Sequence, residues 1–374
     1  MDLFSFLKLM VERNASDLFF SAGARPNFKV EGVTYPADAP AFGPGEVKQL
    51  AYSVMNTKQI GQFEATMEMN LAVSAENIGR FRINIYQQRG EVAMVVRYIR
   101  STIPSFSELS LPPILEKLVM VKRGLILIVG STGSGKSTTM AAMIDYRNEH
   151  ATGHILCIED PIEFIHQHKK SVVDQREVGI DTQSYAEALK NAMREAPDVI
   201  AIGEIRDRAT MQYAIAYAET GHLCLSTLHA NNSNQAIERI INFFPEDAQK
   251  QLLMDMSINL RAVVSQRLIP GIGQKLVLAV EVMLLSPLIS ELIQKGRIDE
   301  IKSVMTRSRE LDMVTFDQAL YDLYTAGRIR ADEALRNADS RTDLQLRIKL
   351  SHGVSSDTGD LSMMPREATR PSRK

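Results

Sequence analysis

Apolar and polar residues alternate along this chain either with the two-residue period of a strand or with the 3.6-residue period of a helix, and both periods occur in the first hundred residues. Between Arg80 and Tyr86 the two kinds alternate strictly, so the apolar side chains share one face of a predicted strand. A second predicted strand runs from 92 to 99. Positions 1–10 instead have apolar residues at helical spacing, and no signal-peptide cleavage site follows them. The pattern predicts a small α+β domain over residues 1–100.

The alternation ends at a stretch rich in Ser, Thr and Pro, which we predict to be an interdomain linker over residues 101–113. Beyond it, short apolar runs alternate with helical patterns. This order is typical of a parallel sheet with crossover helices. The predicted strands span 155–158, 199–202 and 223–227, and the predicted helices between them span 185–194 and 209–218.

After residue 245 the pattern is mostly helical, and we expect these helices to cap the sheet. They are predicted at 252–268, 289–294, 298–309, 315–324 and 331–338. The second domain is therefore predicted to cover residues 114–350. The remaining stretch, 351–374, has few large apolar residues and much Ser, Asp, Arg and Pro, which predicts a disordered tail.

The stretch from Leu125 to Thr138 passes from a buried-strand pattern through glycines into a helix that begins near Ser137. Its residues 130–137 fit G-x-x-x-x-G-K-[ST], the pattern of a loop whose backbone N–H groups cradle phosphate at a helix N-terminus. Lys136 is predicted to reach the β- and γ-phosphates, and the Ser137 hydroxyl to ligate Mg²⁺. The residues of this stretch predicted to bind nucleotide are Gly130, Ser131, Thr132, Gly133, Ser134, Gly135, Lys136, Ser137 and Thr138.

Acidic residues follow two of the predicted strands, as hydrolysis of a bound nucleotide requires. The run Ile158–Phe164, which contains Glu163, has three acids in five residues, although a solvated acidic loop would look the same. Glu204 follows four apolar residues and a glycine, so 199–204 resembles a Walker B strand that ends in Glu rather than Asp. At the sheet's carboxyl edge, these acids would meet the phosphate loop.

Two histidines, His222 and His229, bracket the predicted strand 223–227. Seven extended residues span more than ~20 Å, so the pair cannot bind one metal ion. A hydrogen-bonded core histidine is the ordinary interpretation of each. If either acts on the nucleotide, His229 at the carboxyl end is placed to sense the γ-phosphate, and His222 would face another part of an assembly.

Composition narrows the classes of function. The formal net charge is -2, aromatic residues make up 6% and Trp is absent, which disfavours a RecA-like nucleic-acid motor. No run of 18 apolar residues occurs, so we expect no transmembrane segment. The only two cysteines, Cys157 and Cys224, lie in apolar strand patterns, and we expect two buried thiols in a reducing cytoplasm.

Four motifs in order resemble the secretion ATPase superfamily of type II and type IV secretion and pilus systems. Besides the phosphate loop they read IEDPIEF, PDVIAIGEIRD and TGHLCLSTLHA, at 158–164, 197–207 and 220–230. Within that superfamily, ASDL at 15–18, SAG at 21–23 and RFR at 80–82 resemble the type IV pilus retraction ATPases, the PilT/PilU group. The likeness covers about residues 3 to 345.

The resemblance implies an α/β fold: a RecA-like P-loop ATPase domain with a parallel sheet, after a smaller α+β PAS-like domain and before C-terminal helices. It implies a homohexamer that uses ATP and Mg²⁺, lies in the cytoplasm peripheral to the inner membrane at the pilus base, and acts on an inner-membrane pilus platform protein. By position, the residues that it implies in catalysis or nucleotide binding are Lys136, Ser137, Glu163, Glu204 (Walker B, near the metal), His229, and the N-terminal arginines Arg80, Arg82 and Arg97. His222 and His229 match the family's His box.

The three arginines also fit an ordinary solvated sheet face, so their interpretation stays open at the level of the sequence. At two places away from these arginines, the sequence differs from the pattern of the retraction motors. Residues 288–295 read LISELIQK where an AIRNLIR-type helix is expected, and 196–198 read APD where DPD is common. With the polar tail, these features resemble the PilU branch, an accessory to a paralogous retraction ATPase.

Two further functions remain as alternatives. One is a pilus assembly or type II secretion ATPase, although such relatives have an extra N-terminal domain and a zinc-binding tetracysteine that are absent from this sequence. The other is a nucleotide-gated accessory ring partner that does not hydrolyse ATP, which the presence of Lys136, Glu163 and Glu204 disfavours.

Overall fold

A computed structural model describes residues 2–273 and 275–351 of the chain. The predicted disordered tail, 351–374, lies outside the described residues except for Ser351, the last residue of a helix. The chain divides into two compact units, one formed by Met1–Leu268 with Leu278–Thr315 and the other by Ile269–Val277 with the chain from Phe316 on. The first unit contains two sheets, each with a hydrophobic core of its own.

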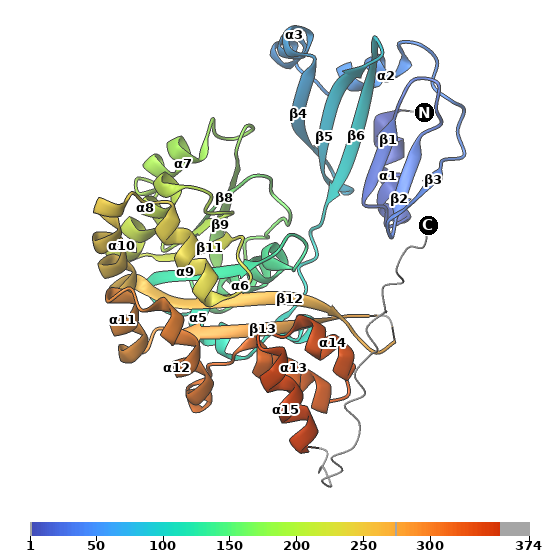
Figure 1. The fold of residues 1–374 in the computed structure, drawn as a ribbon. Coiled ribbons are helices and arrows are strands. Elements are labelled where there is room, and N and C mark those ends of the chain that lie inside the picture. The colour runs from blue at the N-terminus through green and yellow to red at the C-terminus, as the bar shows by residue number, and fades with distance from the viewer. Residues whose placement is uncertain (1, 274, 352–374) are drawn as a thin grey trace, which may run out of the picture. The chain divides into compact units, whose positions relative to one another are not determined.

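The N-terminal sheet has six strands in the order β3-β2-β1-β6-β5-β4, and every neighbouring pair is antiparallel (Figure 1). Alternation along β5 buries Phe81, Ile83 and Ile85, as predicted, against a core that helix α1 shares. The elements are α1 (Leu3–Glu12), β1 (Asp17–Phe20), β2 (Asn27–Val30), β3 (Val33–Pro36), α2 (Glu46–Tyr52), α3 (Thr57–Thr66), β4 (Glu68–Ala75), β5 (Gly79–Gln88) and β6 (Glu91–Ile99).

The second sheet has seven strands in the order β13-β12-β7-β11-β10-β8-β9. From β12 to β9 all neighbours run parallel, which confirms the predicted α/β class. Strands β7, β10 and β11 are buried along their whole length, the pattern of parallel strands covered on both faces. The strands are β7 (Gly124–Gly130), β8 (Gly153–Glu159), β9 (Ser171–Glu177), β10 (Val199–Ile202), β11 (Leu223–Leu228), β12 (Leu260–Pro270) and β13 (Leu276–Leu284).

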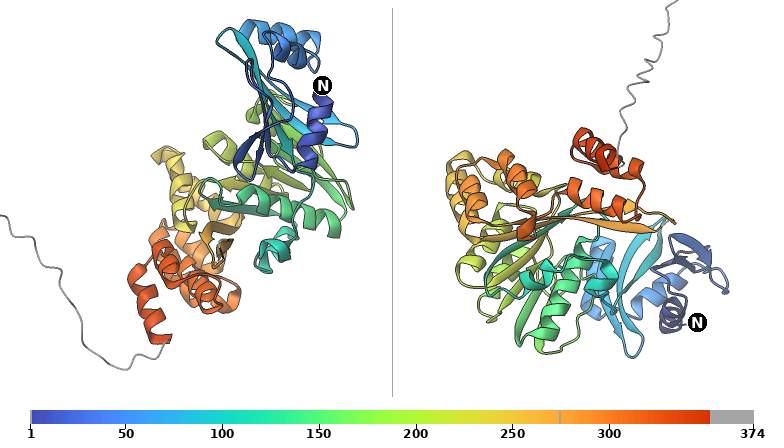
Figure 2. Two further views of the ribbon diagram at one scale, coloured as in Figure 1. Left: turned by 90° about the vertical axis from the view of Figure 1, so that its right-hand side faces the viewer. Right: turned by 90° about the horizontal axis from the view of Figure 1, so that it is seen from below.

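Helices cover both faces of this sheet, which Figure 2 shows from two further sides. One face packs against α7 (Tyr185–Ala192), α8 (Arg208–Glu219), α9 (Ser233–Asn242), α10 (Glu246–Asn259), α11 (Pro287–Gln294), η1 (Ile298–Glu300) and α12 (Ile301–Arg307), after which comes η2 (Arg309–Leu311). The other face packs against α4 (Phe106–Leu109), α5 (Ile114–Val119) and α6 (Lys136–His150). Cys157 and Cys224 are both buried free thiols inside these layers, as the sequence predicted.

Several segments have a local structure that the sequence pattern did not predict. The helix predicted over 252–268 is wrong beyond Asn259, because the chain there enters β12, whose buried apolar run cannot be told from a buried helix by periodicity. The edge strand β9 has only two apolar residues and was not predicted. The second half of the predicted linker contains helix α4, which begins at a capping box formed by Ser105 and Glu108 and buries Phe106 in the core.

Within the residues that the structure describes, the second unit contains a hairpin tip and three short helices. The helices are α13 (Phe316–Thr325), α14 (Ala331–Asn337) and α15 (Arg341–Ser351). Within the unit, the N–H of Ile272 in the hairpin tip donates to the carbonyl of Arg328, at 3.0 Å. Across the described part of the chain, no helix has the length and apolar character needed to cross a membrane.

Candidate functional site

The carboxyl ends of four neighbouring strands lie along one edge of the seven-stranded sheet. Their parallel register pairs Ile158 with Ile202, Ile202 with Ser226, and Leu228 with Val129. The segments that follow these strands therefore leave the sheet together, since parallel strands end on the same side. They contain the phosphate loop, both predicted acids and His229.

The phosphate loop has the backbone that its glycines predict. Gly133 and Gly135 have positive φ angles of 77° and 90°, and Gly135 is the N-cap of α6. Gly130 is needed for a different reason: a Cβ there would lie 2.3 Å from Ser134 Oγ and 2.7 Å from the carbonyl oxygen of Gln266. The helix begins at Lys136, so its first N–H groups point toward the loop.

Lys136 is buried beneath the loop. Its Nζ donates to the carbonyls of Gly130 and Ser131, both at 3.0 Å. Desolvation lowers the pKa of the Lys136 ammonium, and the negative charges of Glu204 and Glu163 oppose that shift. The cation is thus held at the loop with two carboxylates facing it.

Glu163 lies in an extended segment between β8 and β9. Ile162 and Phe164 on either side are buried, whereas Glu163 is exposed. The Ser137 hydroxyl donates to Glu163 Oε1 at 3.1 Å, which brings the predicted catalytic carboxylate next to the predicted metal-binding hydroxyl.

Glu204 follows β10 and has two partners. Arg206 Nε donates to Glu204 Oε2 at 2.7 Å, and His229 Nε2 lies 3.2 Å from Glu204 Oε1. Arg206 Nη1 also reaches Asp160 Oδ2, at 3.4 Å. Desolvation and the charge of Lys136 lower the pKa of His229, and the charge of Glu204 opposes that shift.

These side chains surround one cavity of about 180 Å³, lined among others by Lys136, Ser137, Glu163, Glu204 and His229. From the predicted nucleotide-binding stretch, Thr132 and Gly133 also line it. Sequence reasoning missed several further lining residues, among them Arg206 and Tyr185. Arg206 could have been found from its position two residues after Glu204. Nothing in the sequence distinguishes Tyr185, whose hydroxyl would lie 2.8 Å from a Cβ added to Gly203.

The N-terminal arginines do not line this cavity. Arg97 Nε donates to Asp17 Oδ1 at 2.8 Å, and Arg82 Nε lies 3.9 Å from Glu177 Oε1. Arg80 Nε is buried without a hydrogen-bond partner. Arg82 and Arg97 line a separate cavity of about 480 Å³ to which Glu163 and Thr138 of the ATPase part also contribute.

The two histidines lie at opposite ends of β11, as expected from the sequence. His222, before the strand, is bonded locally through Nδ1, which lies 3.1 Å from Thr220 Oγ1 and 3.2 Å from the carbonyl of Tyr217. Of the two, only His229 lies at the cavity.

The site can hold a phosphate chain and a divalent cation. A buried ammonium and loop N–H groups suit phosphate oxygens, and Mg²⁺ is usually bound by one or two protein oxygens together with phosphates. The Ser137 hydroxyl and the carboxylates of Glu163 and Glu204 provide such oxygens on the wall of the cavity.

The fold and the site thus define a P-loop protein of the α/β class, with the phosphate loop between a central parallel strand and the helix after it. Residues 6–338 match the family described as Type II/IV secretion system protein, and the chain belongs to that family.

Relatives agree with this assignment. The type IV pilus ATPase PilU of Pseudomonas aeruginosa is 53% identical over 97% of this chain and 95% of its own length. The type IV pilus retractation ATPase PilT of the same organism is 39% identical over 90% of this chain and 98% of its own. A crystal structure of the pilus retraction motor PilT with bound ADP has a TM-score of 0.86 and 41% identity, covering 92% of this chain and 99% of that one. The resemblance to the pilus retraction ATPases and the predicted fold are confirmed.

Proposed function

We propose that this chain is a Mg²⁺-dependent ATPase that forms a homohexameric ring and drives or assists the retraction of type IV pili. One observation carries the proposal: a lysine ammonium, a serine hydroxyl and two carboxylates meet at a single cavity beside a phosphate loop. The names of the PilU and PilT relatives, and the ADP in the PilT crystal structure, support the choice of nucleotide and of pilus retraction.

In this proposal the loop from Gly130 to Thr138 binds the phosphates, and Lys136 faces the β- and γ-phosphates. The Ser137 hydroxyl and Glu204 would hold Mg²⁺, which when bound would supply positive charge to the phosphate oxygens. His229, which lines the cavity at the end of β11 next to Glu204, would be the neighbour that senses the γ-phosphate.

Glu163 is the proposed base that takes a proton from the attacking water. Its exposed carboxylate lies next to the Ser137 hydroxyl, which would bring it near a water beside the γ-phosphate. A general base contributes about 10² to 10⁴ in rate, so a Glu163→Gln variant should keep nucleotide affinity and lose most turnover.

We further propose that residues 1–100 form a domain that moves about the linker 101–113 relative to the ATPase domain, 114–350. Arg97, or its neighbours Arg80 and Arg82, would act on nucleotide held by Lys136 of the adjacent subunit. None of the three lines the nucleotide cavity of its own chain, which is compatible with action in trans, and Arg82 and Arg97 line the neighbouring cavity that shares Glu163 with it.

In the cell we place the ring in the cytoplasm, peripheral to the inner membrane at the pilus base. There it would act on the inner-membrane platform protein together with a paralogous retraction ATPase, and without nucleic acid. The greater identity to the PilU relative than to the PilT relative supports the accessory branch.

A phosphate-release assay on the purified full chain tests the enzymatic part. We expect turnover by the wild type and loss of turnover in both Lys136→Ala and Glu163→Gln, with ADP affinity lost only in the first. A wild-type protein that binds ATP with Mg²⁺ but releases no phosphate would instead support the nucleotide-gated ring partner.

Mixing tests the action in trans. Lys136→Ala rings and Arg97→Ala rings should both be nearly inactive. After subunit exchange, some interfaces would pair an intact Lys136 with an intact Arg97, and activity should return. Mixed rings that contain both chains yet stay inactive would exclude Arg97, and the same mixture with Arg80→Ala or Arg82→Ala then tests the other two.

Gene deletion tests the direction of force. The gene and its paralogue are deleted separately and together, and surface pili are counted in each strain. The counts distinguish a retraction motor from an assembly motor. Excess pili with lost surface motility means retraction, and absent pili means assembly.

A further inference from the structure

The segment that carries Glu163 contributes no strand to the sheet. It lies between the end of β8 at Glu159 and the start of β9 at Ser171, and within it Ile162, Phe164 and His166 are buried whereas Glu163 is exposed. A loop of this kind leaves its carboxylate free to move unless other groups fix its backbone. A general base must be held within hydrogen-bonding reach of its water, so the position of Glu163 needs a structural cause.

The N–H of Ile165 donates to the carbonyl of Arg100 at 3.0 Å, and a side chain on the neighbouring edge strand adds further bonds to the segment. Gln175 of β9 donates from Nε2 to Glu159 Oε1 at 2.9 Å and to the Phe164 carbonyl at 2.8 Å. Its Oε1 accepts from the N–H of His166 at 2.9 Å. Both hydrogens of the amide and one lone pair of its oxygen are therefore used on a single segment.

We propose that Gln175 is the positioning residue for Glu163: it fixes the backbone directly after Glu163 and the strand end before it. This inference rests on the proposed role of Glu163 in ATP hydrolysis. Phe164 is the next residue after Glu163, so a hydrogen bond to its carbonyl limits rotation of the peptide that aims the carboxylate at Ser137. The bond to Glu159 holds the start of the segment at β8.

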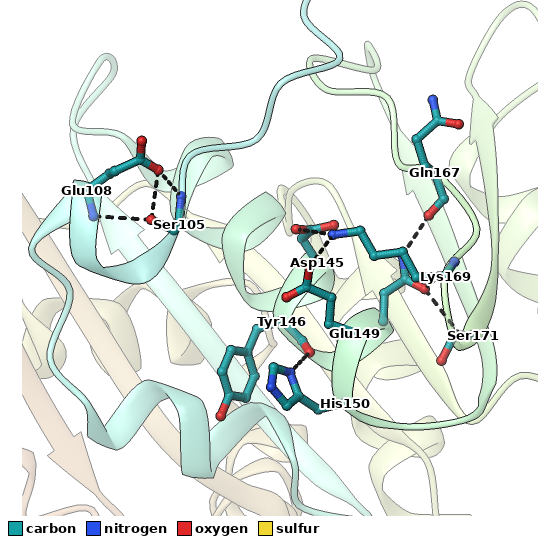
Figure 3. Close-up of polar contacts among 10 residues, drawn as sticks. Ser105, Glu108, Asp145, Tyr146, Glu149, His150, Gln167, Lys169 and Ser171 are labelled. Carbon is teal, nitrogen blue, oxygen red and sulfur yellow. Dashed lines mark hydrogen bonds and ion pairs between the residues drawn. The ribbon is translucent and has the colours of Figure 1, made fainter.

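The far end of the segment has an independent anchor on α6. Asn148, which is fully buried, donates from Nδ2 to the Gln167 carbonyl at 2.6 Å and accepts from the N–H of Lys169 at 3.1 Å. Lys169 Nζ also binds Asp145 and Glu149 of the same helix, at 2.9 and 2.8 Å (Figure 3). Loss of Gln175 should thus loosen residues 160–166 without releasing the rest of the segment or the fold.

The consequence for kinetics is specific. Lys136, Ser137 and the loop backbone do not depend on Gln175, so nucleotide binding should survive its removal. The alignment of the Glu163 carboxylate should be lost. A displacement of about 1 Å near reacting atoms can lower the rate about 10²-fold.

The test compares three variants of the full chain with the wild type. Gln175→Ala removes all three hydrogen bonds, and Gln175→Met removes them while keeping a side chain of similar length. Asp174→Ala is the matched control, because Asp174 is the preceding residue on β9, is exposed, and contacts His154 Nε2 at 3.0 Å, away from the cavity. Turnover, KM for ATP, ADP affinity and hydrogen exchange of the peptide covering 160–168 are measured on each.

We expect kcat to fall about 10- to 100-fold in both Gln175 variants, with KM and ADP affinity within about twofold of wild type and faster exchange in the 160–168 peptide. Asp174→Ala should match the wild type in all four. Wild-type kcat in Gln175→Met overturns the inference, and so does a kcat loss with equal loss of ADP affinity, which would mean general unfolding. If the wild type itself releases no phosphate, the proposed ATPase function is wrong. Hydrogen exchange then still tests the anchoring role separately, because an unchanged exchange rate of the 160–168 peptide in Gln175→Met would overturn it.

Discussion

The carboxyl group of Glu159 should make the stability of this protein fall as pH rises toward neutral. Glu159 ends β8, and desolvation there, helped by the charges of Glu163 and Glu177, raises its pKa from 4.5 to about 7 despite the hydrogen bond from Gln175. Between those values the folded state binds more protons at this group than the unfolded state does. The stability that this group contributes is therefore fully present below about pH 4.5 and is lost as pH rises through about 7.

The size of the effect follows from the shift. A shift from 4.5 to about 7 at 1.36 kcal/mol per pH unit gives about 3 kcal/mol as an upper bound, and water entry at the site reduces it to about 1 to 3 kcal/mol. Glu159→Gln removes the titration while its amide oxygen can still accept from Gln175. The variant should be more stable than the wild type by that amount at about pH 8, and the gain should vanish near pH 4.5.

Urea unfolding of the nucleotide-free protein, followed by circular dichroism from about pH 5 to pH 8, measures this difference. Glu76→Gln at an exposed turn is the control for a Glu to Gln change as such. A free energy difference between Glu159→Gln and the wild type that stays constant over this pH range would refute the reasoning.

Three further outcomes are expected. Lys136→Ala removes the ammonium that binds the loop carbonyls, so affinity for a fluorescent ADP analogue should fall at least about tenfold, and wild-type affinity would contradict its role. Gly130→Ala forces a Cβ to 2.3 Å from Ser134 Oγ, and overpacking should lower the free energy of unfolding by about 1 to 3 kcal/mol in urea titrations. Gly61→Ala is the same substitution inside helix α3, where an added Cβ would have no atom within 4 Å. It should raise the free energy of unfolding by about 0.5 to 1 kcal/mol, and a loss of stability would contradict the helical assignment.

The central part of the site could be predicted because each functional residue follows a short apolar run. The runs before Gly130, Glu204 and His229 are fully buried strands, and burial on both faces gives the near-continuous apolar pattern that a sequence displays directly. Glu163 could be found from its acidic neighbours, although the sequence alone did not exclude a solvated loop.

Other parts could not be predicted because their sequence signal is shared with other structures. Strand β9 is an edge strand whose residues are mostly polar, so Gln175 looked like an ordinary surface residue. Tyr185 opens a helix far along the chain and reaches the cavity only through tertiary packing. The apolar run that starts at Leu260 fits a buried helix as well as the strand that it forms.

The parallel register of β8, β10, β11 and β7 also determines where the chain can tolerate a change in length. Side chains on a strand alternate between faces, and each residue advances the backbone by about 3.3 Å, so one residue inserted into β10 would turn the side chains after it to the opposite face and move Glu204 away from His229. A residue inserted in the turn 178–184, by contrast, would lengthen a surface connection and leave that spacing unchanged. Homologous chains of different length should therefore gain or lose residues in such turns and keep the length of these strands constant.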